Sequence, residues 1–461
     1  MTLMKSRFGL GLLAAGSLLV AAAPALAQST FGELDRTAAA EIDFSSAQRG
    51  TPILAGSQAT ISGQGFKAGQ QVTLLYGTTP LTSSPLVADA EGKVTGTVAV
   101  PANAVSGVHP ILVVAQGPYY ATVSELKVSP NVPVSGMESF QITTAEVTRG
   151  LYQSAYSAKN DTLFVASAIG RPPVRESELV KLNGQDLSVL ARTTPQAVEG
   201  QEGVYAVYGL GVDDTHGTVW ATNTRQNTVS VYNQADLSLV KQFPAGTVAH
   251  ARDVVVDEAL GKAFSSATGT PDVVVFDTAS VEPTGKITVR SPQRGTEFSA
   301  ASLSLDEQAH RLYVSSLSNE VAVINAQSGE VLNVFPVPGA KGVIGVSHDA
   351  QTGRIFVAAQ GTDNLVVLDG QTGAVVADTP VGAGALNVAF DPVTRHAYVT
   401  NRGAGTVTVT DVDGKIVSNL GPAPLANHVS LGKDGVVYVV DKSAGQREAD
   451  ADTLLRIQPR R

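Results

Sequence analysis

The chain repeats a short apolar run centred on an aromatic residue, and this repetition restricts the fold more than any other feature. A second apolar run follows each aromatic after about ten to fifteen residues, and most of these second runs end in Asn or Asp. Repeats about 40–56 residues apart indicate a β-propeller or a solenoid and not a fold with a single core. The repeated aromatics are Phe164, Trp220, Phe264, Tyr313, Phe356, Tyr398 and Tyr438.

Most repeats contain four strand signals separated by turns that carry Gly or Asp. In the repeat around Phe356, the expected strands begin with residues 343–346, 355–358, 365–368 and 374–377. Short alternating strands with short connections are typical of antiparallel sheets. The sequence therefore predicts an all-β fold in which each repeat forms one four-stranded blade.

The last repeat lacks a fourth strand before the chain ends, and an unassigned strand signal, residues 140–147, precedes the first repeat. An open ring would leave an unpaired strand edge and uncovered blade faces. We therefore expect residues 140–147 to become the outer strand of the last blade. This closure predicts a seven-bladed propeller spanning residues 138–461.

The first residues have the pattern of a secretory signal. Lys5 and Arg7 precede an apolar run, and Ala25-Leu26-Ala27 forms a small-residue cleavage site before Gln28. We expect residues 1–27 to be removed and the mature chain to be periplasmic or secreted without a transmembrane segment. An uncleaved membrane anchor is the alternative.

Residues 28–50 are small and polar and are expected to form a linker. Residues 51–130 contain short alternating strands without a helical pattern, which predicts a small β-sandwich. The order of Gly-Phe, an acidic-Gly hairpin at Ala90-Glu91-Gly92 and a Ser-Gly-x-His segment resembles bacterial immunoglobulin-like modules. That resemblance implies a spacer or an adhesion unit.

Composition excludes several kinds of chemistry. The chain has no cysteine, which removes disulfides, thiol nucleophiles and cysteine-ligated metals. Its formal net charge is −9, and loss of Lys5 and Arg7 would make it more acidic. A broad surface for nucleic acid or anionic membrane is therefore disfavoured, although a local basic patch remains compatible with this balance.

The repeats also resemble a known family. The segment around Tyr398 reads AYVTN and is followed by TVTVTD, and an earlier repeat reads NLVVLDGQTGAVVADTPVG from residue 364. These motifs resemble the YVTN repeat, a WD40-like β-propeller repeat. Residues from Arg149 onward, including RGLYQSAYS and ARDVVVD, resemble the YncE-like periplasmic propellers. The resemblance implies the fold and leaves the function open.

Propeller ligands bind where the first strands begin and the loops between second and third strands converge. Alignment of the repeats places a group of Arg, Asn, His and Tyr side chains there, suited to an anion, a peptide terminus or a single-stranded polymer. The alternative is that these groups are solvated or satisfy buried backbone. The candidate ligand-binding residues are Tyr152, Asn223, Arg252, Asp253, Asn387, Arg402, Asn427 and His428.

Neither a nucleophile elbow nor a local metal-binding histidine motif occurs in the sequence. No catalytic residue, metal site or cofactor is therefore predicted. The favoured hypothesis is a monomeric, non-catalytic binding or scaffold protein of the bacterial envelope. Its expected partner is an envelope protein, a peptide or a small anionic ligand.

Two other functions stay open. A metal-dependent propeller hydrolase resembling a lactonase would use ligands from different repeats, with Asp253, Asn387, Asn427 and His428 as the donors. Binding of nucleic acid or another polyanion would use Arg225, Arg252 and Arg402. Metal dependence would support the first, and salt-sensitive polyanion binding would support the second.

Overall fold

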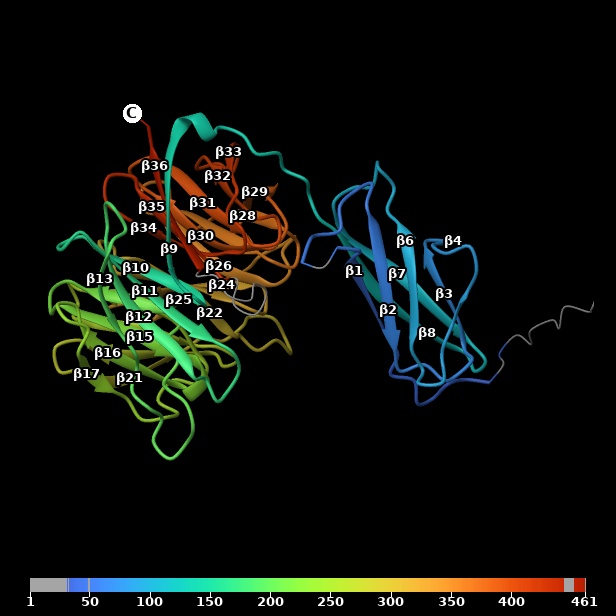
Figure 1. Cartoon of the computed structure of the whole chain (residues 1–461), viewed down its shortest axis with the longest axis horizontal. Coiled ribbons are helices and arrows are strands. Elements are labelled where there is room, and N and C mark those ends of the chain that lie inside the picture. Colours follow the sequence, from blue (N-terminus) through green and yellow to red (C-terminus); the bar gives the residue numbers. More distant parts are fainter. Residues whose placement is uncertain (1–30, 32, 49, 443–451, 461) are drawn as a thin grey trace, which may run out of the picture.

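A computed structural model describes residues 31, 33–48, 50–442 and 452–460, so the expected signal peptide lies outside the described residues. The described chain forms two β-rich units joined by a connection that ends near residue 139 (Figure 1). Its helices are two short 3-10 turns, η1 (Met137–Ser139) and η2 (Thr224–Gln226). Within these described ranges, no helix is long and apolar enough to cross a membrane.

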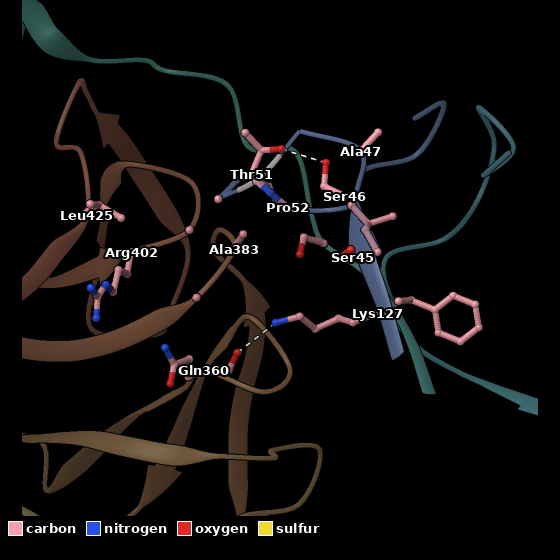
Figure 2. Close-up of a pocket in the computed structure, with 16 residues that line it drawn as sticks. Ser45, Ser46, Ala47, Thr51, Pro52, Lys127, Gln360, Ala383, Arg402 and Leu425 are labelled. Atoms are coloured by element: carbon pink, nitrogen blue, oxygen red, sulfur yellow. Dashed lines mark hydrogen bonds between the residues drawn. The ribbon is translucent and has the colours of Figure 1, made fainter. Parts of the chain in front are cut away.

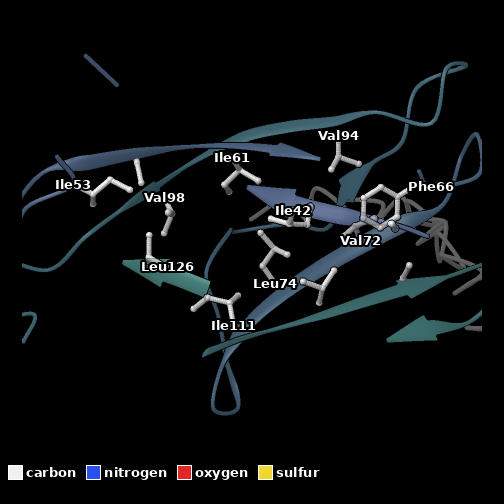
Figure 3. Close-up of a cluster of buried hydrophobic side chains, with 14 of the residues drawn as sticks. Ile42, Ile53, Ile61, Phe66, Val72, Leu74, Val94, Val98, Ile111 and Leu126 are labelled. Atoms are coloured by element: carbon white, nitrogen blue, oxygen red, sulfur yellow. The ribbon is translucent and has the colours of Figure 1, made fainter. Parts of the chain in front are cut away.

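The N-terminal unit consists of two antiparallel sheets around one core. The order of one sheet is β1-β2-β6, and the other runs β4-β3-β7-β8 with β5 on the edge of β3. Alternate residues of both sheets point inward, including Ile61 and Leu74, which are fully buried (Figure 3). The strands are β1 (Glu41–Ser46), β2 (Gln58–Gln64), β3 (Gln71–Tyr76), β4 (Thr79–Pro80), β5 (Leu86–Val87), β6 (Val94–Ala99), β7 (Gly107–Gln116) and β8 (Tyr120–Val128).

This unit begins earlier than the sequence suggested, because the expected linker of residues 28–50 contains β1. β1 pairs with β2 along its whole length, and Ala40 and Ile42 are buried in the shared core. The apolar alternation in β1 covers only a few residues among polar neighbours, so the local pattern does not distinguish it from an unpaired arm. Pairing with the distant strand β2 makes it a strand.

Residues from Leu151 onward form successive four-stranded antiparallel sheets, each built from consecutive strands. The first three are β10 (Leu151–Ser157), β11 (Thr162–Ile169), β12 (Glu176–Asn183), β13 (Val189–Thr193); β14 (Leu210–Asp213), β15 (Thr218–Asn223), β16 (Thr228–Asn233), β17 (Leu239–Gln242); and β18 (Ala251–Asp257), β19 (Lys262–Ala267), β20 (Asp272–Asp277), β21 (Glu282–Thr288). The next three are β22 (Ala300–Asp306), β23 (Arg311–Ser316), β24 (Glu320–Asn325), β25 (Val331–Pro336); β26 (Val343–Asp349), β27 (Arg354–Ala359), β28 (Asn364–Asp369), β29 (Val375–Pro380); and β30 (Ala385–Asp391), β31 (His396–Asn401), β32 (Thr406–Thr410), β33 (Ile416–Leu420).

One further four-stranded sheet joins the two ends of this unit. It contains β34 (Ala426–Leu431), β35 (Val437–Asp441), β36 (Asp452–Pro459) and, as its fourth strand, β9 (Phe140–Thr148). β9 runs antiparallel to β36, with Phe140 opposite Pro459 and Thr148 opposite Asp452. A buried cluster also joins this sheet to the first one, since Val147 and Tyr438 pack with Leu163.

The repeated aromatics lie on the second strand of each sheet and are buried, which confirms their prediction as core residues. The fifth and sixth sheets show the packing between neighbours. The Phe356 and Phe390 rings stack with centroids 4.8 Å apart and planes 11° apart. The buried clusters thus lie between successive sheets as well as within them.

Strand direction alternates within each sheet, so the loops after second strands and the connections between sheets lie at the same end. We call this end the proximal face; it includes Gln360, Gly384, Arg402 and Lys442. The N-terminal unit contacts it through Asp363, which accepts hydrogen bonds from Lys127 Nζ at 2.8 Å and Ser129 Oγ at 2.7 Å.

Candidate functional site

Five of the candidate residues come together on the proximal face. Tyr152 is the second residue of β10, and the Asn427 side chain donates a 2.7 Å hydrogen bond to the Tyr152 carbonyl. Arg252 Nη1 lies 3.4 Å from Tyr152 Oη, and Arg402 Nη1 lies 3.5 Å from Asn427 Oδ1. His428 Nδ1 accepts from the backbone of β10. Residues from the first, third, sixth and last sheets therefore share one site.

Lys442, which the sequence analysis did not select, lies at the centre of this group. Its Nζ is 3.8 Å from the centroid of the Tyr152 ring and 5.6 Å from that of Tyr208. The two rings meet edge to face with centroids 4.9 Å apart. Arg402 Nη2 donates to the Lys442 carbonyl at 2.9 Å. A cation between two aromatic rings is stabilised by the ring quadrupoles.

A signal for Lys442 was present in the repeats. Lys442 directly follows Asp441 at the end of β35, as Arg402 directly follows Asn401 at the end of β31. Both therefore occupy the same position, the first residue after a second strand. Alignment of this position across all repeats would have identified Lys442 together with Arg402.

Four cationic side chains converge here, and we call Arg225, Arg252, Arg402 and Lys442 the basic cluster. Burial, together with the positive charges of the three arginines, lowers the pKa of Lys442 to about 7. Burial also lowers the pKa of Arg402. The pKa of His428 falls to about 3 because of burial and the charge of Arg252, so His428 is neutral at physiological pH.

Two carboxylates lie close enough to oppose this positive charge. Asp452 accepts hydrogen bonds from the backbone of Gly150 and Leu151 through Oδ2. The pKa of Asp441 is raised to about 6, chiefly by burial and in part by the charge of Asp452. Among the residues that the structure describes, four cationic side chains meet two carboxylates here, and this excess of positive charge favours an anion.

The other three candidates are occupied in holding the sheets together. Asp253 accepts backbone hydrogen bonds from Val254 and from Leu303 of the next sheet, each at 3.0 Å. Asn387 Oδ1 accepts from the backbone of Val429, also in the next sheet. Asn223 is fully buried and donates to a backbone carbonyl. These groups satisfy buried backbone, the alternative considered from the sequence.

The four residues expected to bind a metal in a metal-dependent enzyme instead form hydrogen bonds with the backbone. The side chains of Asp253, Asn387, Asn427 and His428 each have a backbone partner. In the part of the chain that the structure describes, no group of three or more His, Asp or Glu side chains is arranged to hold a metal ion.

A cavity of about 620 Å³ lies between the N-terminal unit and the proximal face. Residues 44–47 and 50–53 form one wall, and Ala383, Arg402 and Leu425 contribute to the other (Figure 2). Arg402 belongs to both the cavity and the basic cluster. The cavity and the cluster are therefore adjoining parts of one site.

Comparisons with known proteins agree with this architecture. No family model matches the chain. The uncharacterized protein YncE of Salmonella typhimurium is 24% identical over 328 residues, covering 68% of this chain and 89% of that protein. YncE of Escherichia coli K12 is 25% identical over 343 residues, covering 70% and 93%. These relatives support a YncE-like β-propeller.

A known structure supports the same fold. Hydrazine synthase of Kuenenia stuttgartiensis superimposes with a TM-score of 0.55 at 14% identity, covering 68% of this chain and 96% of that chain. At this identity the match concerns the arrangement of the sheets alone. The YncE-like propeller is the part of the chain that carries the basic cluster.

Proposed function

We propose that this protein is a non-catalytic binding protein of the bacterial envelope that holds an anionic ligand at the basic cluster. The observation that carries the proposal is the position of Lys442, whose ammonium lies over the Tyr152 ring and beside three arginines. Binding alone accounts for such a site, since it needs only positive charge, shape and hydrogen-bond donors.

The electrostatics of the cluster give a reason for this role. Burying a cation beside other cations costs free energy, and the pKa of Lys442 is lowered because burial and the nearby arginines disfavour its charged form. An anion bound among the four cations would favour the charged form of Lys442 and offset the repulsion. The guanidinium groups of Arg252 and Arg402 supply donors suited to carboxylate or phosphate oxygens.

The architecture that we propose around this site has two domains. The four-stranded sheets would be the blades of a seven-bladed propeller over residues 138–461, closed by β9 in the last blade. This assignment is supported by the pairing of β9 with β36 and by the contact of β10 with both β14 and β34. The basic cluster would then surround one mouth of the central channel.

The N-terminal unit would be an immunoglobulin-like β-sandwich, supported by its two antiparallel sheets and their single core. We place the protein in the periplasm or outside the cell, as a monomer released by cleavage after Ala27. The signal-like pattern of residues 1–27 supports this location.

The test is isothermal titration of the mature protein with inorganic phosphate, citrate and glutarate. We expect at least one of them to bind, with affinity that falls between about 50 mM and about 300 mM NaCl because screening weakens charge attraction. Lys442→Met should weaken that binding about tenfold or more. Lys415→Met, in the exposed turn between β32 and β33, is the matched control and should bind as the wild type does.

The proposal would be overturned if none of the three anions bound at millimolar concentration. It would also be overturned if the Lys442→Met and Arg402→Gln proteins bound them as tightly as the Lys415→Met control. Either result would mean that the positive charge on the proximal face serves another purpose.

A further inference from the structure

We propose that the ligand is an extended polypeptide segment with a free terminal carboxylate. Its carboxylate would meet the basic cluster at Arg402, and its backbone would add to the open edge of β1 inside the cavity. The inference rests on the proposed function and names the class of ligand for the same site. It uses three features: an open strand edge, a cavity lined mainly by neutral residues, and one cationic residue, Arg402, that belongs to both the cavity lining and the basic cluster.

The first feature is the edge of β1. β1 ends the sheet order β1-β2-β6, and no strand in the described ranges pairs with its other side. β1 also lies on the side of the N-terminal unit that faces the propeller (Figure 1). An unpaired edge presents a row of backbone donors and acceptors that an added strand can use.

The register shows which residues of β1 face outward. The Ala47 amide donates to the Gln58 carbonyl of the neighbouring strand, and hydrogen bonding alternates along an antiparallel pair. The backbone groups of Phe44 and Ser46 therefore point toward the open side. Nearer the start of β1, the Ile42 carbonyl accepts a hydrogen bond from Ser124 Oγ of β8. The part of the β1 edge that is free to pair with another strand therefore begins at Phe44.

The second feature is the lining of the cavity. Phe44, Pro52, Ile53 and Leu425 supply apolar contacts, and the serines of β1 supply neutral polar groups. The volume of about 620 Å³ lies within the range of ligand sites, about 300–1,000 Å³. Three residues of β1, Phe44 to Ser46, border the cavity, enough to pair with about 10 Å of extended chain.

The third feature is the distribution of charge. Lys127 also lines the cavity, but its Nζ donates to Asp363 at 2.8 Å and to the Gln360 carbonyl at 3.1 Å. Asp363 is 1% exposed, so this pair is a fixed contact between the two units. Arg402 also lines the cavity, and unlike Lys127 it belongs to the basic cluster.

These features together favour a polypeptide over other anions. A phosphate ion would use the cluster and leave the cavity and the edge of β1 unused. A nucleic acid strand has no alternating amide donors and carbonyl acceptors for a strand edge, and most residues of the cavity wall are neutral and would not neutralise its many charges. A carboxylate-terminated peptide matches both parts of the site, with main-chain hydrogen bonds at β1 and a single charge at Arg402.

The experiment compares two pools of N-terminally labelled hexapeptides of random sequence, one with free C-terminal carboxylates and one with C-terminal amides. Fluorescence anisotropy of each pool with the mature protein should show about tenfold tighter binding of the carboxylate pool. Arg402→Gln should remove most of this difference. Equal binding of the two pools would overturn the inference.

A pair of variants at one position tests the strand edge. Ser46→Pro removes an outward amide without removing a bond of the β1–β2 ladder. Ser46→Ala keeps the amide and removes the hydrogen bonds of the side chain, which join Ser46 Oγ to Thr51 Oγ1 and to the Gln48 amide. We expect Ser46→Pro to weaken binding of the carboxylate pool about fivefold and Ser46→Ala to leave it unchanged. Equal affinities of the two variants would refute strand addition.

Small anions separate this inference from the proposed function. Phosphate or citrate should bind Ser46→Pro as tightly as the wild type, which also shows that the variant is folded. If these anions bind and neither peptide pool does, the polypeptide is refuted and the anion site stands. If neither anions nor peptides bind, both proposals fail. Tighter binding of a labelled oligothymidylate than of the carboxylate pool would also refute the polypeptide.

Discussion

Replacing Phe140 by alanine should destabilise the propeller, although this residue precedes all of the repeats in the chain. Phe140 lies in β9 and is 6% exposed. Its ring meets the Tyr398 ring edge to face at 6.5 Å and 82°, within a buried cluster that also contains Leu420 and Ile457. Loss of a buried phenylalanine side chain costs about 3–5 kcal/mol. We expect about 3–4 kcal/mol here, because the neighbouring Met137 can partly fill the space.

Urea unfolding measures this loss of stability, and the intrinsic fluorescence of a tryptophan in another sheet reports it. The chain has a single tryptophan, Trp220, which is buried in the second sheet on β15. If β9 closes one cooperative ring, Phe140→Ala should lower the urea midpoint reported by Trp220 fluorescence. Phe356→Ala, at a fully buried ring stacked on Phe390, supplies the scale for a blade-core residue.

The control is Gln141→Ala at the exposed next residue of β9, which should change the free energy of unfolding by less than about 0.5 kcal/mol. A Phe140→Ala effect no larger than this control would refute the closure of the ring by β9. An effect seen by circular dichroism but absent from Trp220 fluorescence would show that the sheets unfold independently.

Three further predictions concern charged groups. Lys442→Met should raise the thermal midpoint below pH 7 and have little effect near pH 10. The reason is that the lysine pKa falls from 10.5 in the unfolded chain to about 7 in the fold, so the charged lysine destabilises the fold fully below pH 7 and no longer above pH 10.5. Differential scanning calorimetry across this range measures the midpoint, and an unchanged midpoint at pH 6 would contradict the prediction. Arg395→Gln should cost about 1–2 kcal/mol at pH 7, since Arg395 holds the Asp349 pKa near 2 against the desolvation of that carboxylate and is itself partly exposed. That stabilisation is present above the usual pKa of 3.8 and is lost as the pH falls toward 2, so equal midpoints for wild type and variant at pH 7 in urea titrations would be the adverse result. Asp363→Asn should loosen the contact between the two units and increase the radius of gyration in small-angle X-ray scattering, whereas Glu125→Gln, which removes only the exposed pair with Lys341, should not.

The sequence by itself determined the repeat, the all-β class and the buried role of the seven aromatics. These features are local, since alternation of apolar residues and turns with Gly or Asp act within a few residues of the chain. The same local signals indicated a strand in residues 140–147, and the incomplete last repeat indicated where it would pair. The aromatic run at Tyr398 was readable because each repeat places its aromatic in the same second strand.

Tertiary structure decided which polar residues form the site. Asp253 and Arg252 are adjacent in sequence, yet Asp253 bonds to the backbone of Leu303 while Arg252 reaches Tyr152 of another sheet. Lys442 becomes central only because five sheets bring their ends together on one face. β1 is likewise a strand because β2 pairs with it, and the cavity lies where the two units meet, beside the contact of Lys127 with Asp363. Such contacts join residues far apart in the chain, and a side chain's neighbours in sequence do not reveal them.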